Sequence, residues 1–173
     1  APVLEGRRIR RLLVRDRRLR WPVPAGLERR LAGADIDAVE RRAKYLLIRS
    51  SRGTALLHLG MSGSLRLVYD SSPPRPHDHF DLEMDHGPVL RFHDPRRFGS
   101  LLWAGDDPAA HPLLRDLGPE PLGDDFNGEY LHRVSRGRRL AIKPHLMNAH
   151  IVVGVGNIYA SEALFRAGVH PKR

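Results

Sequence analysis

Residues 79–94 read HFDLEMDHGPVLRFHD, and they contain the clearest structural pattern in the chain. Phe80, Leu82 and Met84 alternate with polar residues, which is typical of a strand with one apolar face turned to a core. The turn residues DHGP follow, and then a second apolar segment, VLRFHD. Two such segments joined by a short turn predict an antiparallel β-hairpin.

Further short, strand-like segments lie on both sides of this hairpin, from residue 7 to about residue 105. Each is bounded by Gly, Ser, Asp or Pro, the residues that favour turns. The segments are RRIRRLLV, AKYLLIRS, TALLHLG, SLRLVYD and FGSLLWAG, and GLERRLAG is expected to form one short helix. This succession of short strands predicts a β-sandwich or barrel.

The pattern becomes helical after the Pro- and Asp-rich segment LGPEPLGDDFNGE. EYLHRVSR stops at Gly137, AIKPHLMNAH follows, and NIYASEALFRAG ends at Gly168, a residue that commonly terminates a helix. We therefore expect an α+β chain of more than one domain. Its predicted parts are a β-sandwich over residues 1–105, a linker over 106–127 and a helical domain over 128–173.

The composition favours a polyanionic partner. Lys and Arg number 29 against 20 Asp and Glu, which gives a formal net charge of +9. Nearly all of these cations are Arg, whose planar guanidinium suits phosphate and base-edge contacts. Nucleic acid is the partner this predicts, and a solvated basic surface without special function is the alternative.

The chain contains no Cys, so disulfides, thiol catalysis and Cys-based zinc sites are excluded within it. No apolar run reaches the roughly 18 residues that a membrane span needs, and the first residues, APVLEGRRIRR, lack the apolar stretch of a signal peptide. A cytoplasmic protein without a membrane partner is the resulting expectation.

The segment VVGVGNIYASEALF, residues 152–165, places Gly154 and Gly156 before a predicted helix. A dinucleotide-binding motif needs a third glycine where this chain has Tyr159, so that interpretation fails. One remaining hypothesis is a turn whose backbone N–H groups bind an anion, with Asn157 at the helix cap. The other is a tight turn in which the glycines only let two helices approach closely.

Together with its neighbours, this segment resembles the helix-two-turn-helix of the formamidopyrimidine-DNA glycosylase family, which excises oxidised purines such as 8-oxoguanine. The matching blocks follow the family's order and cover nearly the whole chain: RRAKYLL, HLGMSGSLR, HDHFDL, FHDPRRFG, LGPEPLGDDFNGEYL, AIKPHLM and VVGVGNIYASEALFRAGVHP. The resemblance implies a β-sandwich followed by a helical DNA-binding domain. It also implies base-excision repair by a monomeric, bifunctional glycosylase and abasic-site lyase acting on double-stranded DNA with oxidised purines or abasic sites.

Two parts of the family pattern have no match in these residues. One is the N-terminal motif P-E-L-P-E-V-E, whose proline amine attacks the sugar in the family. Pro2 and Glu5 do not replace it, because their flanks match a later part of the family's first helix. The other is a C-terminal four-Cys finger, so the zinc ion that the family implies has no ligands here. We expect the chain to be a fragment or an incompletely recorded protein.

The resemblance assigns chemistry to residues of the predicted β-sandwich. Lys44, in a predicted strand, matches a lysine described as a general acid in strand cleavage. A solvent-facing cation is the alternative. Met61, Arg96 and Phe98 match the wedge that fills the space left by a flipped nucleotide, a step required because C1′ is inaccessible inside a duplex. Taken alone, Met61 would be a core residue.

The resemblance also assigns DNA-backbone contacts to His77, Arg138, Lys143 and Asn157. Arg138 has Arg136 and Arg139 as neighbours that share or exchange its role. The triplet HDH around His77 is an alternative metal motif, but strand alternation sends Asp78 to the opposite face and no fourth ligand is evident, so no metal site is expected.

Three other functions remain open at this stage. The first is an endonuclease VIII-like glycosylase for oxidised pyrimidines, against which HLGMSGSLR and DPRRFG stand as purine-branch blocks. The second is a non-catalytic DNA-binding fragment, because the nucleophilic proline is absent from these residues. The third is a purely structural basic protein.

Overall fold

The computed structural model describes residues 2–70 and 72–173. It divides into two compact units, Ala1–His111 and Pro112–Arg173, called here the N-terminal and the C-terminal unit. The division falls inside the segment 106–127 that the sequence marks as a linker. None of the helices in the described part of the chain is long and apolar enough to cross a lipid bilayer.

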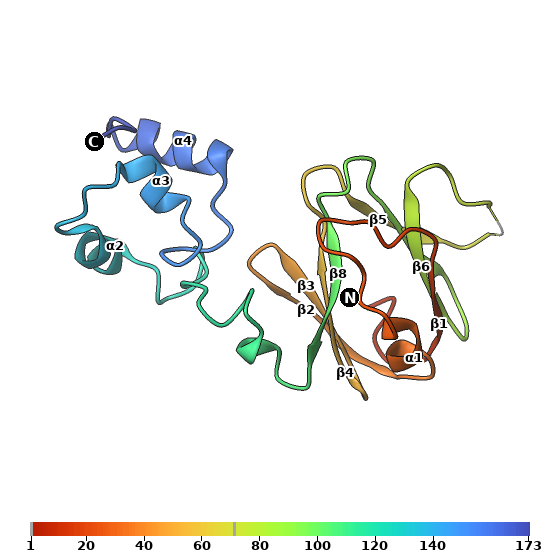
Figure 1. Ribbon diagram of the computed structural model, residues 1–173. Coiled ribbons are helices and arrows are strands. Elements are labelled where there is room, and N and C mark those ends of the chain that lie inside the picture. The colour runs from red at the N-terminus through yellow and green to blue at the C-terminus, as the bar shows by residue number, and fades with distance from the viewer. Residues whose placement is uncertain (1, 71) are drawn as a thin grey trace. The chain divides into compact units, whose positions relative to one another are not determined.

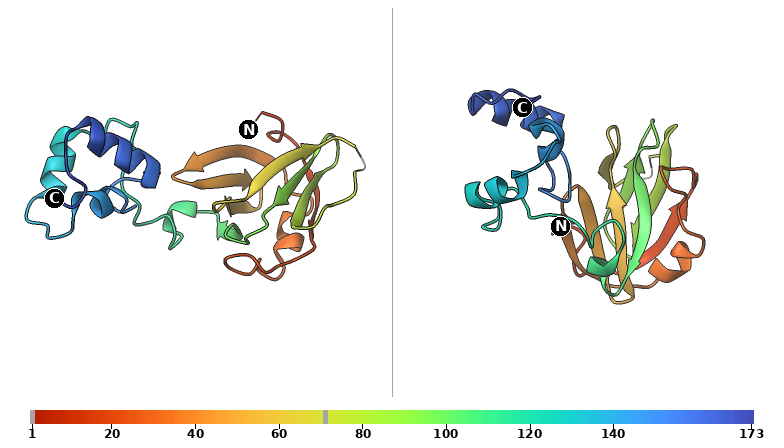
Figure 2. Two further views of the ribbon diagram at one scale, coloured as in Figure 1. Left: turned by 90° about the horizontal axis from the view of Figure 1, so that it is seen from above. Right: turned by 60° about the vertical axis from the view of Figure 1, so that its left-hand side comes forward.

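In the described residues of the N-terminal unit there are eight strands and one α-helix. Figures 1 and 2 show how they are arranged. They are β1 Ile9–Val14, α1 Leu27–Leu31, β2 Ile36–Arg42, β3 Tyr45–Ser50, β4 Gly53–His58, β5 Ser64–Val68, β6 Asp78–Met84, β7 Val89–His93 and β8 Ser100–Gly105. The strands form two four-stranded sheets, ordered β1-β6-β7-β5 and β2-β3-β4-β8. All pairs of neighbouring strands are antiparallel, and the β-sandwich expected from the sequence is confirmed.

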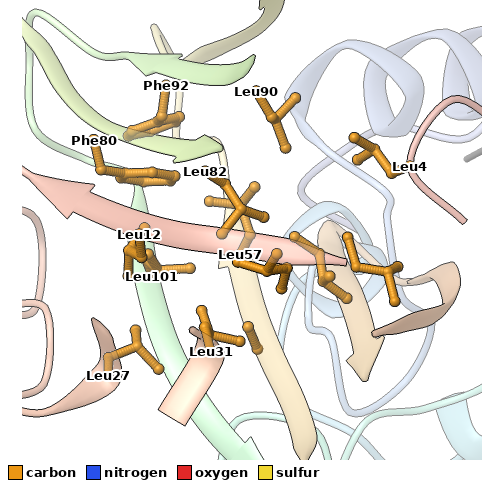
Figure 3. Close-up of a cluster of buried hydrophobic side chains, with 14 of the residues drawn as sticks. Leu4, Leu12, Leu27, Leu31, Leu57, Phe80, Leu82, Leu90, Phe92 and Leu101 are labelled. Carbon is orange, nitrogen blue, oxygen red and sulfur yellow. The ribbon is translucent and has the colours of Figure 1, made fainter. Parts of the chain in front are cut away.

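β6 and β7 form the hairpin that the alternating pattern predicts. Phe80 pairs with Phe92 and Leu82 with Leu90 across the two strands. The rings of Phe80 and Phe92 stack with their centroids 5.0 Å apart. These residues join a core to which both sheets and α1 contribute, as Figure 3 shows. Removing this apolar surface from water is the main force that holds the two sheets together.

The other face of β6 is also buried, although its residues are charged. Asp81 and Glu83 are only 3% and 6% exposed. Arg91 Nε donates to Asp81 at 2.8 Å, and Arg11 Nε donates to Glu83 at 3.0 Å. Arginine side chains thus cover the carboxylates that would face water on a simple two-sided sheet, and the pairing offsets the cost of burying charge.

One strand, β2, was not expected from the sequence. Its residues, IDAVERR, contain three consecutive charged residues and no sustained alternation of apolar and polar positions. Pairing with the strongly apolar β3, from Arg42 opposite Tyr45 to Ile36 opposite Ser50, holds it in the sheet. Tertiary pairing therefore overrides a weak local preference.

The C-terminal unit contains α2 Gly128–Ser135, α3 Ile142–Leu146 and α4 Asn157–Arg166. A short 3₁₀ helix, η1 Pro108–Ala110, lies before this unit in the chain. The Asn127 side chain caps α2 by accepting from Tyr130 N at 2.9 Å. α4 ends as its sequence predicts, because Gly168 adopts a positive φ of 64° and Val169 N bonds back to Leu164 O.

Candidate functional site

An open hollow of about 690 Å³ lies on the N-terminal unit. It is lined by Arg20, Lys44, His58, Gly60, Met61, Arg96, Arg97 and Phe98. The structure therefore brings together four residues that the sequence singles out, namely Lys44, Met61, Arg96 and Phe98. They come from three separate segments: the turn between β2 and β3, the loop after β4 and the loop after β7.

Lys44 lies in a turn, not within a strand as expected. Arg42 and Tyr45 are cross-strand partners, which leaves Ala43 and Lys44 as a two-residue turn. Ala43 has a φ of 56°, in the left-handed region that residues with a Cβ seldom adopt. Arg41 Nη1 donates to Ala43 O at 2.8 Å and helps to hold this conformation. The turn presents the exposed Lys44 side chain at the hollow.

Met61 stands out from the loop between β4 and β5. Its side chain is 77% exposed, which rules out the core position that is usual for methionine. Gly60, the preceding residue, has a φ of 69°, and a Cβ there would lie 2.5 Å from the backbone carbon of Phe98. The absence of a side chain at Gly60 therefore lets this loop approach the loop that carries Phe98.

Arg96 and Phe98 contact each other within the loop after β7. The guanidinium carbon of Arg96 lies 4.5 Å from the centroid of the Phe98 ring, which is a cation–π distance. Between them, Arg97 has a φ of 58° and forms an ion pair with Asp16 at 3.0 Å. Arg97 is thus anchored to the body of the unit, while Arg96 and Phe98 line the hollow.

The hollow is also lined by three residues that the sequence analysis did not identify, namely His58, Arg20 and Arg97. His58 pairs across β3 and β4 with Tyr45, and their ring centroids lie 4.9 Å apart. Gly60 N donates to His58 Nδ1 at 2.9 Å, so this nitrogen carries no proton. Burial lowers the pKa of His58, and the nearby cations Arg20 and Lys44 lower the pKa further.

Burial also raises the pKa of the Tyr45 hydroxyl, against the opposing effect of Arg20. The lowered pKa of His58 and the raised pKa of Tyr45 both favour the neutral form of the side chain. The positive charge of the hollow therefore comes from its arginines and Lys44, and neutral His58 accepts a hydrogen bond that shapes the loop before Met61.

His77 does not line this hollow. It is exposed, has a φ of 71° and precedes the first residue of β6. Its ring centroid lies 6.1 Å from that of His93, and its carbonyl accepts from Asp94 N at 3.0 Å. Asp78 is buried and accepts from Arg66 at 2.7 Å. Among residues 2–70 and 72–173, no group of three or more His, Cys, Asp or Glu is arranged to hold a metal ion.

The C-terminal unit carries Arg138, Lys143 and Asn157. Arg138 is exposed and its Nε donates to Val134 O at 3.3 Å, while Lys143 lies in α3. Asn157 is not the helix cap that we expected. Gly156 takes that position with an extended backbone, φ −108° and ψ −174°, and its carbonyl accepts from Ala160 N at 2.9 Å. Asn157 is the first helical residue, and its side chain is exposed.

Gly154 is the first of the two glycines in the turn before α4. Gly154 has a φ of 76°, and a Cβ at this position would meet no atom within 4 Å. At this position the positive φ favours glycine, and close packing of two helices does not require it. The turn leads into the N-terminus of α4, where unpaired backbone N–H groups favour an anion.

A second hollow, of about 930 Å³, lies among α2, α3 and α4 and is mostly apolar. Of the predicted DNA contacts it includes Arg138 but neither Lys143 nor Asn157. His145 is largely buried and is one of the residues that line it. Burial together with the charge of Arg138 lowers the pKa of that imidazole. This hollow does not bring the predicted residues of the C-terminal unit together.

Comparison with protein families gives two matches. The model of the formamidopyrimidine-DNA glycosylase N-terminal domain matches residues 1–101, and that of the formamidopyrimidine-DNA glycosylase H2TH domain matches residues 117–173. Among curated proteins, the formamidopyrimidine-DNA glycosylase of Stutzerimonas stutzeri is 62% identical over 172 residues, which cover 99% of this chain and 63% of the relative. That of Thioalkalivibrio sulfidiphilus is 61% identical, with 97% and 62% covered. The chain thus spans less than two thirds of the length of these relatives.

Solved structures of Lactococcus lactis Fpg also resemble the chain. Its complex with DNA containing an abasic site has a TM-score of 0.88 and 29% sequence identity, covering 98% of this chain and 63% of that protein. Its complex with DNA containing Fapy-dG has the same TM-score and identity, with 98% and 64% covered.

Proposed function

Because the chain belongs to the formamidopyrimidine-DNA glycosylase family, we propose that it forms the DNA-holding part of a base-excision repair enzyme that removes oxidised purines. The observation that carries this proposal is the convergence of Lys44, Met61, Arg96 and Phe98 on one hollow of the N-terminal unit. We propose double-stranded DNA with an oxidised purine or an abasic site as the partner of a monomer. The relatives named above are formamidopyrimidine-DNA glycosylases, which favours this function over the endonuclease VIII-like alternative.

The exposure of the apolar side chains supports a wedge. Met61 and Phe98 are 77% and 41% exposed, although burying these apolar side chains away from water would be favourable. A glycosylase must extrude its target nucleotide, and an inserted apolar side chain compensates for the lost stacking. Met61 and Phe98 would enter the duplex, and Arg96, held against the Phe98 ring, would donate hydrogen bonds to the unpaired base opposite.

The cations of the hollow support binding of the DNA backbone beside the flipped nucleotide. Arg20, Lys44 and Arg96 line it together, and their charge attracts phosphate at a distance governed by salt. Lys44 has a flexible stem and a proton to donate, so it suits the role of general acid in strand cleavage. Neutral His58 keeps its Nε2 side available for a hydrogen bond, since Gly60 N already occupies Nδ1.

The remaining predicted contacts would hold the duplex at either side of the lesion. His77 lies on the N-terminal unit, and Arg138, Lys143 and Asn157 lie on the C-terminal unit. Contacts of this kind to phosphate oxygens set the position of a protein on DNA without reading its sequence. Asn157 and the first N–H groups of α4 provide neutral donors, and Lys143 and Arg138 add charge.

We propose none of these 173 residues as the nucleophile that attacks the sugar. Glu5 Oε1 accepts from Val39 N at 2.9 Å, which gives this carboxylate a structural role and supports rejecting it as a substitute for the family's glutamate. We propose that the lyase step uses the family's N-terminal proline motif, which has no match here. The residues present do not fit the family's zinc site either, because the chain has no Cys.

Paired excision assays on the full-length product of the gene test this function. Duplexes carrying 8-oxoguanine opposite cytosine should be cleaved, and duplexes carrying thymine glycol should react more slowly. Faster excision of thymine glycol would support the pyrimidine-specific alternative. Tight binding to both duplexes without release of either base would support a non-catalytic DNA-binding protein.

A further inference from the structure

Asp94 lies at the base of the loop that carries Arg96 and Phe98, and it is fully buried. Its two carboxylate oxygens accept three hydrogen bonds. Ser62 Oγ donates to Oδ1 at 2.6 Å, Arg96 N donates to Oδ1 at 3.3 Å, and Gly99 N donates to Oδ2 at 2.7 Å. One carboxylate thus joins the loop after β4 to both ends of the loop after β7.

The backbone of Asp94 is bonded as fully as its side chain. Its N–H donates to His77 O at 3.0 Å. Its carbonyl lies 2.7 Å from His79 Nε2, and because a carbonyl only accepts, this nitrogen must carry the proton and donate. The carbonyl also accepts from Arg97 N at 3.3 Å. Asp94 is therefore fixed to the start of β6, which belongs to the sheet core.

The two loops also meet through glycines that leave no room for side chains. A Cβ on Gly60 would lie 2.7 Å from Gly99 N, and a Cβ on Gly99 would lie 2.8 Å from His58 O. The backbones are consequently in direct contact, and small changes in one loop must displace the other. The Asp94 carboxylate sits 3.1 Å from the position of a Gly99 Cβ, at the centre of this contact.

We propose that Asp94 is a positioning residue that holds the loops carrying Met61, Arg96 and Phe98 in one arrangement, ready to enter the duplex together. This inference rests on the proposed function, since it assigns Asp94 a part in wedge insertion. The chemistry requires a carboxylate, because it offers two accepting oxygens to the donors on either side. An amide at this position would present its NH₂ group to the backbone N–H of either Arg96 or Gly99, which can only donate and would lose that hydrogen bond.

The test is a double-mutant cycle in the full-length product of the gene. Asp94→Asn is made in the wild type and in a Met61→Ala/Phe98→Ala background, and excision of 8-oxoguanine is measured under single-turnover conditions. Misplacement of a positioned group by about 1 Å costs on the order of 100-fold in rate, so this loss is expected for Asp94→Asn in the wild type. In the double-alanine background, the further loss should be less than about five-fold, because residues that act together are not additive.

Asp81→Asn is the matched control, because it makes the same change at a buried carboxylate on the outer face of β6. It should lower thermal stability as Asp94→Asn does, but its effect on excision should be equal in both backgrounds. Equal losses from Asp94→Asn in both backgrounds would overturn the proposal and leave Asp94 a structural residue.

Hydrogen exchange at the Gly99 amide separates this inference from the proposed function. Asp94→Ala, which removes both accepting oxygens, should speed exchange of Gly99 by about 100-fold relative to the strand amides of β4 and β6, and Asp81→Ala should not. If the wild type excises no oxidised purine, the proposed function fails, but this exchange result still decides whether Asp94 holds the loop. Unchanged protection of Gly99 in Asp94→Ala would overturn the positioning role.

Discussion

The guanidinium of Arg96 rests on the ring of Phe98, with 4.5 Å between the guanidinium carbon and the ring centroid. The two side chains therefore form one unit before any DNA is bound. The ring limits the directions in which Arg96 can point, and this lowers the entropy that Arg96 must lose on meeting an unpaired base.

Phe98→Leu should weaken binding to lesion-containing DNA by about two- to five-fold, which corresponds to the roughly 0.5–1 kcal/mol of an exposed cation–π contact. The leucine keeps apolar bulk at the position but cannot support Arg96. Titration of labelled duplex measures the affinity. Tyr69→Leu is the control, because Tyr69 is an exposed aromatic residue that does not line the hollow. An equal loss in both variants would contradict a specific role of the Arg96–Phe98 pair.

Lys44→Gln should reduce the salt dependence of DNA binding. If Lys44 neutralises one phosphate, the slope of log K against log salt concentration should become shallower by about 0.9. Affinity measured at several salt concentrations gives this slope. Arg10→Gln removes a charge from an exposed side chain of β1 outside the hollow, and its slope should match the wild type. An unchanged slope in Lys44→Gln would remove Lys44 from the DNA contacts.

His58→Asn should make stability less sensitive to pH. Burial and the charges of Arg20 and Lys44 hold the pKa of His58 below its usual 6.5 in the folded protein. Below pH 6.5 the unfolded chain therefore binds more protons than the folded one, so stability falls as pH falls toward the folded pKa. Asn has no such proton and still offers an oxygen to Gly60 N. The slope should be smaller in the variant but not zero, since burial also lowers the pKa of His111 and His145.

Denaturant unfolding between about pH 6.5 and 5 measures this effect, because histidine is the side chain that ordinarily titrates there. The carboxylates with lowered pKa, such as Asp81 and Glu83, lose their stabilising effect only below their usual values of 3.8 and 4.5. A wild-type slope in His58→Asn would contradict a pKa of His58 that is lower in the folded protein than in the unfolded chain.

Asp81→Ala should lower the free energy of unfolding by about 3–5 kcal/mol, because it removes the nearest charge partner of the buried Arg91 guanidinium, which then keeps only a 4.0 Å ion pair with Asp78. Asp81 is bonded to Arg91 through both Nε and Nη2, at 2.8 and 2.9 Å, and it also pairs with Arg15. Asp35→Ala breaks the pair with Arg8, in which both side chains are about half exposed, so its free energy of unfolding should fall far less than that of Asp81→Ala. Similar losses in the two variants would contradict the structural role given to the buried network.

The fold was predictable where periodicity and turn residues agree. Phe80, Leu82 and Met84 alternate, the turn DHGP follows, and the structure has β6 and β7 there. The strand Ile36–Arg42 was missed because its charged residues carry no alternation and its partner β3 holds it in place. Local patterns report on one segment, whereas sheet membership depends on segments that are distant in the sequence.

Some residues of the hollow could be identified from the sequence, and others could not. Met61, Arg96 and Phe98 were identified through short blocks that resemble a known family, not through any periodic pattern. His58 reaches the hollow by pairing with Tyr45, and Arg20 comes from the irregular segment after β1. The signal that would have found His58 is its position directly before Leu59–Gly60–Met61, at the end of a predicted strand. Arg20 carried no such signal, because neither spacing nor composition marks it among the many arginines.

Borohydride trapping distinguishes a glycosylase that forms a Schiff base with DNA from a protein that only binds DNA. Full-length product of the gene and the polypeptide of residues 1–173 are each incubated with a duplex containing 8-oxoguanine, reduced, and examined by mass spectrometry. Reduction of a Schiff base joins protein to DNA permanently, so the account predicts a covalent complex with the full-length product. It predicts salt-sensitive binding but no covalent complex with residues 1–173. No trapping by the full-length product, or trapping by residues 1–173 alone, would contradict the account.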